Sequence, residues 1–204
     1  QAGRFPYPFA EWNDGFRDTI RRFWRGDEGM LPALAAKLLG SADRFEGNRR
    51  SPWASINYVA SHDGATMADL TAYERKHNWA NGEQNRDGHG DELGRNHGFE
   101  GASENPVIMS ARARTMRAYL ATLMLAQGTP MLLGGDEIAR SQEGNNNAYC
   151  QDNGMTWASW TCMPLHHEEI ADFIGRLAAL RRDHPALRQH RFLQPFDRPG
   201  GKTR

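Results

Sequence analysis

The sequence predicts an α/β fold built around a parallel sheet, and two observations lead to this prediction. Short apolar runs rich in β-forming residues alternate with longer runs in which apolar residues recur every three or four positions. The short runs end in acidic or polar side chains, as strands do where a loop begins. With 204 residues, of which 39% are hydrophobic, the chain is also long enough to bury one core.

The central predicted strand lies within residues 55–64, Ser-Ile-Asn-Tyr-Val-Ala-Ser-His-Asp-Gly. Its first half is mostly apolar and β-forming, and it stops at His62 and Asp63, followed by Gly64. In parallel α/β sheets this carboxyl edge binds ligands, because the strand fixes the side chains while the following loop leaves them open to solvent. The alternative is that His62 and Asp63 only cap the next helix.

The first part of the chain predicts a strand followed by two helices. Residues 9–12 form a short aromatic run that ends at Glu11 and Trp12. Residues 14–25 show helical spacing, with an Asn-Asp pair at the start as the N-cap and the arginines off the apolar face. Residues 30–39 form a second amphipathic run, with a proline in the first turn and a glycine just past the end.

The middle of the chain predicts a short helix and then a long loop. Residues 67–73 suit a helix with Thr66 as its cap. The next stretch, residues 74–105, holds six glycines and five asparagines without a regular pattern. It is longer than the roughly 12 to 15 residues of ordinary structureless loops, and loops of such length are usually functional or disordered. Because aromatic residues and both charge signs occur in it, an ordered active-site loop is favoured.

Three residues of this loop, Asp87, His89 and Asp91, alternate like the start of a calcium-binding loop. However, Glu92 stands where the turn glycine belongs and Gly98 where the bidentate glutamate belongs. The sequence therefore predicts no metal site, and no cofactor.

The last third of the chain returns to alternating elements. Residues 107–127 predict the longest helix, residues 129–133 a third strand, and residues 168–184 a final helix that a proline ends.

Two polar clusters follow the third strand. Asp136 and Glu137 come after a glycine pair, which suits either a close approach to a ligand or simply a tight turn. Further along, Asn145, Asn146 and Asn147 give an amide-rich surface suited to hydroxyl-rich ligands. Asparagine-rich turns also occur merely as turns.

Composition excludes several classes of function. Lys and Arg together number 25, as do Asp and Glu, and no basic block could neutralise a run of phosphates, so nucleic acid is not an expected partner. No apolar stretch approaches 18 residues and no signal-peptide region appears, so a soluble chain without membrane contact is expected. Cys150 and Cys162 lack metal-binding spacing, which favours free thiols and a cytoplasmic location.

Five ordered blocks of sequence resemble one known family. They are Phe-Ala-Glu-Trp-Asn-Asp with Arg-Asp-Thr-Ile-Arg-Arg-Phe-Trp-Arg-Gly, the run 55–64, Lys-His-Asn-Trp-Ala-Asn-Gly-Glu-Gln-Asn-Arg-Asp-Gly from Lys76, Gln-Gly-Thr-Pro-Met-Leu-Leu-Gly-Gly-Asp-Glu from Gln127, and Gly-Asn-Asn-Asn-Ala-Tyr-Cys-Gln-Asp-Asn from Gly144. Together they resemble the isoamylase-type glycogen debranching enzymes of the α-amylase superfamily, in particular those of bacterial glycogen operons. The chain departs from the family pattern at Ala65 and at residues 95–97.

This resemblance implies a (β/α)8 barrel of which the chain holds the last three strands. Residues 1–190 would form the C-terminal part of the barrel, and residues 191–204 the beginning of a truncated C-terminal β domain. The family's nucleophilic aspartate and general-acid glutamate lie on the fourth and fifth strands and have no counterpart here. The missing N-terminal half of the barrel is thus an expected partner, and the chain alone is expected to be inactive.

The resemblance also implies a substrate and roles for the polar strand ends. The substrate would be a branched α-glucan, glycogen or limit dextrin, cleaved at α-1,6 branch points by a retaining mechanism. Asp63 would be the third, transition-state-stabilising carboxylate, with His62 donating to a hydroxyl of the same sugar. The expected substrate-binding residues are His62, Glu11, Trp12, Asp136, Glu137, Asn145, Asn146 and Asn147.

Two alternatives of other classes stay open at this point. One is a noncatalytic glucan-binding subunit or regulatory relative. The other is a metal-dependent hydrolase that uses the histidines of the loop 74–105.

Overall fold

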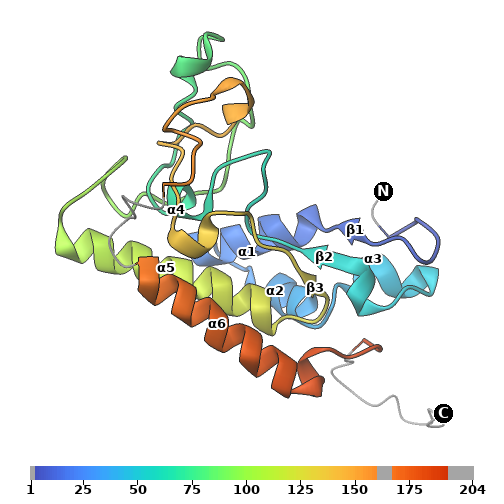
Figure 1. Cartoon of the computed structure of the whole chain (residues 1–204). Helices are drawn as coiled ribbons and strands as arrows, with labels where there is room; N and C mark the ends of the chain where they lie inside the picture. The colour runs from blue at the N-terminus through green and yellow to red at the C-terminus, as the bar shows by residue number, and fades with distance from the viewer. Residues whose placement is uncertain (1–2, 160–166, 193–204) are drawn as a thin grey trace, which may run out of the picture.

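A parallel three-stranded sheet lies at the centre of the computed structural model, which describes residues 3–159 and 167–192. The strands are β1 (Glu11–Trp12), β2 (Ser55–Asn57) and β3 (Thr129–Pro130), in the order β1-β2-β3. Both neighbouring pairs are parallel, so the three carboxyl ends meet at one edge of the sheet (Figure 1). The predicted α/β class with a parallel sheet is confirmed.

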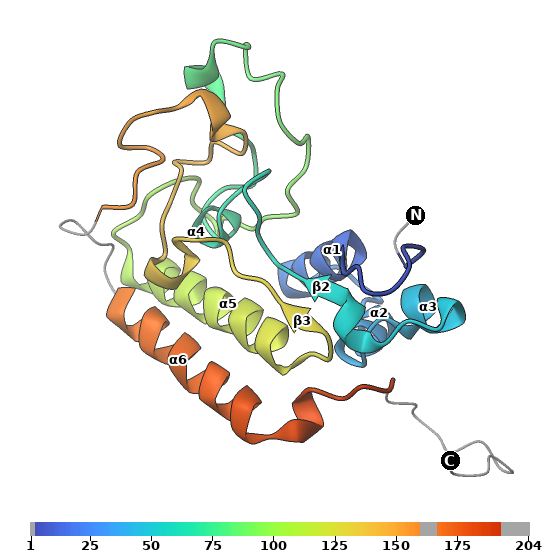
Figure 2. The same cartoon turned by 45° about the vertical axis from the view of Figure 1, so that its right-hand side comes forward.

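Within the described residues, six α-helices accompany the sheet. They are α1 (Asp14–Arg25), α2 (Leu31–Leu38), α3 (Ala42–Phe45), α4 (Met67–Leu70), α5 (Pro106–Leu125) and α6 (His167–Asp183). The long helices α5 and α6 lie side by side, and α1 packs against α5 (Figures 1 and 2). Their apolar faces share one core with the chain that follows β2; its fully buried members include Phe16, Ile20, Val59, Tyr119, Leu120, Leu123 and Ile170.

Helices α1 and α4 begin where the sequence places polar caps. The Asn13 side chain accepts a hydrogen bond of 3.0 Å from the backbone N–H of Phe16, and Thr66 accepts one of 3.2 Å from that of Asp69. Helix α1 ends at Gly26, whose φ of 100° suits glycine. The predicted starts of α1 and α4 and the end of α1 are therefore confirmed.

Two predicted elements are shorter than expected. Helix α4 stops at Leu70 instead of residue 73, because the Leu70 carbonyl accepts from the Arg95 N–H (2.8 Å) and not from the next helical turn. Strand β3 covers Thr129–Pro130 instead of extending to residue 133; pairing ends after the Met131 N–H donates to the Asn57 carbonyl at 2.8 Å. The short helix α3 was not expected from the sequence.

Two long segments, residues 74–105 and 141–157, leave the carboxyl side of the sheet and form a projecting lobe (Figures 1 and 2). Paired amides fasten them together. Asn78 Nδ2 donates to Asn146 Oδ1 at 2.8 Å, and the Asn146 N–H donates back to Asn78 Oδ1 at 3.0 Å. The long loop predicted from the sequence is thus ordered, and we refer to the two segments as the lobe.

Some sequence predictions concern chain outside the described residues. Most of the expected β domain at 191–204 lies there, as does Cys162, whereas Cys150 is exposed with a free thiol. Among the described residues, none of the helices combines the length and the apolar character that crossing a membrane requires.

Candidate functional site

Three of the predicted site residues meet at the carboxyl edge of the sheet. The His62 and Asp63 side chains follow β2 and are 68% and 75% exposed, with His62 Nε2 3.5 Å from Asp63 Oδ2. Trp12, at the end of β1, lies edge-on to the His62 ring, with 5.7 Å between the ring centroids. Adjacent parallel strands therefore bring a carboxylate, an imidazole and an indole to one open surface.

The turn that carries Asp63 depends on a glycine. Gly64 has a φ of +144°, and a Cβ added to it would lie 3.2 Å and 3.3 Å from the two carboxylate oxygens of Glu92. A side chain at position 64 would thus be strained and would crowd Glu92. The Glu92 carboxylate lies directly beside the backbone that carries Asp63.

Glu92 is held by a buried arginine. Arg21 Nη1 donates to Glu92 Oε2 at 2.6 Å, and Arg21 Nε donates to the Val59 carbonyl beyond β2 at 2.8 Å. The Arg21 and Glu92 side chains are only 4% and 13% exposed. Glu92 Oε1 accepts from Asn146 Nδ2 at 2.8 Å. One ion pair therefore connects α1, the chain after β2 and the lobe.

Sequence reasoning missed this pair. Helical spacing places Arg21 off the apolar face of α1, yet Arg21 is 3% exposed because the loop carrying Glu92 folds over it. The prediction places the arginines off the apolar face of this helix, but it does not anticipate that a distant loop buries Arg21. No local pattern marks it, since its partner is 71 residues away in the chain.

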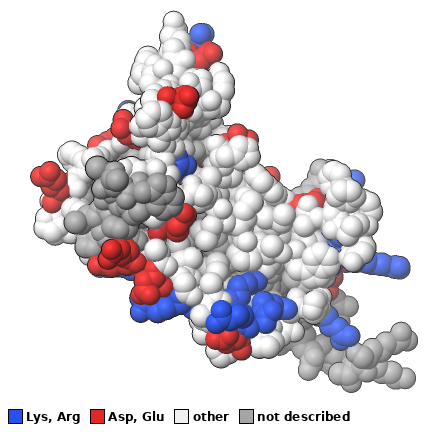
Figure 3. All heavy atoms as spheres, in the orientation of Figure 1, with Lys and Arg blue, Asp and Glu red and all other residues white. Residues whose placement is uncertain are grey.

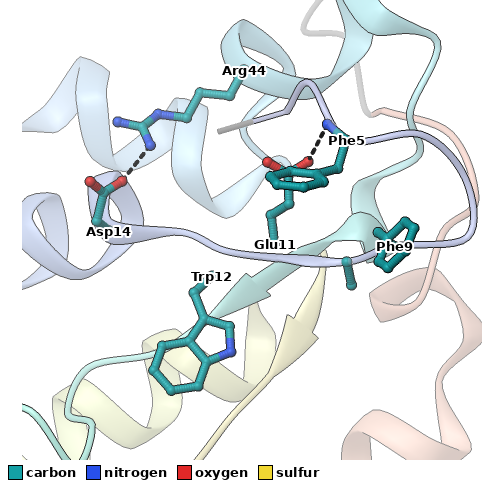
Figure 4. Close-up of a pocket in the computed structure, with 7 residues that line it drawn as sticks. Phe5, Phe9, Glu11, Trp12, Asp14 and Arg44 are labelled. Carbon is teal, nitrogen blue, oxygen red and sulfur yellow. Dashed lines mark hydrogen bonds and ion pairs between the residues drawn. The ribbon is translucent and has the colours of Figure 1, made fainter. Parts of the chain in front are cut away.

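Glu11 lies on the opposite side of β1 from Trp12, beside an open hollow of about 740 Å³ (Figure 4). Its carboxylate accepts from the backbone N–H groups of Gly3 (2.6 Å) and Phe5 (3.2 Å) and pairs with Arg50 at 3.1 Å. Its side chain is 9% exposed. Glu11 therefore holds the N-terminal segment in place, and both of its carboxylate oxygens already accept hydrogen bonds within the protein.

Asp136, which the sequence predicts as a substrate-binding residue, is buried under the turn after β3. It is 2% exposed, and its Oδ1 accepts from the Met67 N–H at 2.9 Å. Its Oδ2 is buried without a hydrogen-bond partner among the described residues. Burial raises the pKa of Asp136 to about 7, although the Met67 N–H and the nearby Arg140 oppose the rise. Glu137 Oε2 accepts from the Gly135 N–H at 2.8 Å and so serves the same turn.

The asparagine cluster also differs from the expected ligand surface. Asn145 and Asn146 are 0% and 2% exposed, and their amides bind the other segment of the lobe. Asn147 Nδ2 donates to Asp87 Oδ2 at 2.9 Å. These side chains hold the lobe together because each amide finds its partner within the protein.

Two histidines of the lobe lie beside polar side chains. His77 Nε2 lies 3.0 Å from Glu100 Oε1, and His97 Nε2 lies 3.2 Å from Thr115 Oγ1. Within residues 3–159 and 167–192, no three His, Cys, Asp or Glu side chains gather as metal ligands would.

The fold and this edge define a class: an α/β protein with a parallel sheet whose strands are followed at their carboxyl ends by an exposed acid, an imidazole and an aromatic ring. No family model matches the chain. Comparison with individual proteins shows more specifically which enzymes the chain is similar to.

The chain is 47% identical over 197 residues to the glycogen debranching enzyme of Dickeya chrysanthemi and 49% identical over 198 residues to that of Erwinia tasmaniensis. Each match covers 97% of this chain and 30% of the relative. It is 46% identical over 194 residues to the glycogen operon protein GlgX homolog of Mycobacterium tuberculosis. The resemblance seen in the sequence is confirmed: nearly the whole chain is homologous to part of the bacterial glycogen debranching enzymes, and it spans about 30% of their length.

Solved structures agree on the fold. The pullulanase of Paenibacillus barengoltzii in complex with maltohexaose and α-cyclodextrin superposes with a TM-score of 0.64 at 25% identity, over 89% of this chain and 25% of that one. The pullulanase of Bacillus acidopullulyticus gives a TM-score of 0.61 at 23% identity, over 88% of this chain and 19% of that one.

Proposed function

We propose that this chain acts within a longer glycoside hydrolase of the α-amylase superfamily that cleaves α-1,6 branch points of glycogen or limit dextrin. The observation that carries the proposal is the exposed His62–Asp63 pair beside Trp12, in a chain 46–49% identical to glycogen debranching enzymes. In this enzyme the three strands belong to a (β/α)8 barrel. A cytoplasmic location stays a prediction from the cysteine content.

The proposed mechanism is retaining hydrolysis. It needs one carboxylate to attack the anomeric carbon and another to protonate the leaving oxygen, and both come from strands that precede this sequence in the relatives' fold. Asp63 accepts hydrogen bonds from two hydroxyls of the sugar that is being distorted, and these bonds strengthen as the ring flattens toward the transition state. His62 donates to a hydroxyl of the same sugar. The Trp12 ring packs against the sugar's apolar face.

Asp63→Asn in the longer polypeptide tests the proposal, because the substitution keeps the shape of the side chain and removes its charge. Two charge-assisted hydrogen bonds of about 1.5–3 kcal/mol each correspond to a fall in kcat of about two to four decades. KM and the melting temperature should change little. The matched control is Asp172→Asn in the exposed Asp172–Arg176 pair of α6, which should leave kcat unaltered.

A near-normal kcat for Asp63→Asn would refute the catalytic role of Asp63, and because Thr66 already caps the following helix, no capping role would replace it. The noncatalytic alternative predicts another result, namely that the wild-type polypeptide binds limit dextrin but releases no reducing ends from it.

A further inference from the structure

Two aromatic side chains at the tip of the lobe are among the most exposed large apolar groups of the described chain. Trp79, in the short helix η3 (Trp79–Asn81), is 67% exposed, and Tyr149, in η5 (Ala148–Cys150), is 78% exposed. In both cartoon views the tip lies well away from the strands (Figures 1 and 2). Exposed rings on two turns that hydrogen-bond to each other suggest a binding surface.

The turns that carry these rings are fixed to each other. Asn81 Nδ2 donates to the Asn147 carbonyl at 2.9 Å. Asn81 Oδ1 accepts from Asn145 Nδ2 and from Gln151 Nε2, both at 2.8 Å. Because a hydrogen-bonded base holds both rings, a ligand that binds them has little loop ordering to overcome.

The polar atoms of these two rings are also unused. Neither the Trp79 indole N–H nor the Tyr149 hydroxyl has a hydrogen-bond partner among the described residues, and no other aromatic ring there packs on them. Other tryptophans differ: Trp24 Nε1 donates to Thr122 Oγ1 at 3.0 Å, and Trp157 Nε1 donates to Asp152 Oδ1 at 2.9 Å. Trp79 and Tyr149 therefore offer both an apolar face and a free donor.

We propose that Trp79 and Tyr149 form a second glucan-binding surface, separate from the Trp12–His62–Asp63 edge, that takes a linear arm of the branched substrate. A glucose ring presents an apolar C–H face with hydroxyls around its rim, which matches an aromatic face with a donor at its edge. Both charge signs occur near the tip (Figure 3), so the surface is not selective for a charged ligand. The inference rests on the proposed function for its ligand class, but it uses other residues.

Titration of the protein with maltoheptaose, followed through the indole N–H signals in NMR spectra, tests the proposal. We expect the Trp79 signal to shift on binding. Trp79→Ala and Tyr149→Ala should each raise the Kd of the tip site about two- to tenfold, the effect of losing one aromatic contact of about 0.5–1.5 kcal/mol. Trp157→Ala, which removes a 61% exposed ring that already has a partner, is the matched control and should leave that Kd unchanged.

Trp12→Ala separates this inference from the proposed function. Suppose that Trp12→Ala weakens maltoheptaose binding but neither Trp79→Ala nor Tyr149→Ala alters it. That result overturns the tip site and leaves the proposed function standing. If the indole signals of Trp79 and Trp12 both stay unshifted in the wild-type protein, the tip site and the proposed function are both refuted. A change in oligomeric state on Trp79→Ala or Tyr149→Ala, without a change in sugar affinity, would make the tip a protein contact and overturn the inference.

Discussion

Replacing Arg21 with methionine should destabilise the protein strongly. The change keeps an unbranched apolar stem, but it removes the guanidinium donors that bind Glu92 Oε2 at 2.6 Å, the Glu92 carbonyl at 2.9 Å and the Val59 carbonyl at 2.8 Å. The Glu92 carboxylate would then lie buried with Asn146 as its remaining donor. Breaking a buried ion pair in this way costs about 3–5 kcal/mol.

Urea unfolding at pH 7, followed by tryptophan fluorescence, measures this loss as a drop in the free energy of unfolding. The matched control is Arg176→Met, because Arg176 pairs with Asp172 at 2.8 Å but both side chains are more than 60% exposed. The control should lose no more than about 1 kcal/mol. If Arg21→Met costs as little as the control, the pair does not hold the lobe to the sheet. In the double variant Arg21→Met/Glu92→Leu, the free energy of unfolding should fall by less than the sum of the losses in the two single variants, since no unpaired charge remains.

Two further predictions concern pH. Because burial raises the pKa of Asp136 to about 7, the folded state binds more protons than the unfolded state between about pH 4 and 7, so stability falls as pH rises through that range. Asp136→Asn should flatten this dependence and raise the melting temperature at pH 8 relative to wild type. Burial alone would raise the pKa of Glu100. Hydrogen bonds to its carboxylate, chiefly from the backbone N–H of Glu74 and from the His77 side chain, outweigh burial and lower this pKa to about 2. Its contribution to stability is present above about pH 4.5 and lost as pH falls toward 2, so Glu100→Gln should lower the melting temperature at pH 7 but not at pH 2.

The strand ends and helix starts could be predicted because their signals are local. A short β-forming run that stops at polar residues marks β2, and a polar cap before an amphipathic run marks α1. The meeting of Trp12 with His62 also follows from local signals, since parallel neighbours place their carboxyl ends together.

The interior of the lobe could not be predicted in this way. An asparagine in a glycine-rich segment suits a ligand, a turn or a distant partner equally well, and only the fold decides among them. Asn146 pairs with Asn78, 68 residues earlier in the chain, and Asp136 binds the Met67 N–H, 69 residues earlier. Asn146 and Asp136 looked like ligand groups in the sequence, but in the structure both have hydrogen-bond partners within the protein.

The amide pairs of the lobe also affect how fast its asparagines deamidate. Asn81 precedes Gly82, and an asparagine before glycine deamidates readily when its side chain can turn back onto the next backbone nitrogen. Here that side chain is half-buried and is held by Asp87 and by Asn147 from the other segment of the lobe, whereas Asn153, before Gly154, is exposed and bonds to its near neighbours Gln151 and Met155. We expect mass spectrometry of stored protein to find deamidation at Asn153 before Asn81. Deamidation at Asn81 would place a new negative charge beside Asp87 and weaken the lobe. The contacts that hold the lobe together therefore also slow the reaction that would destabilise it.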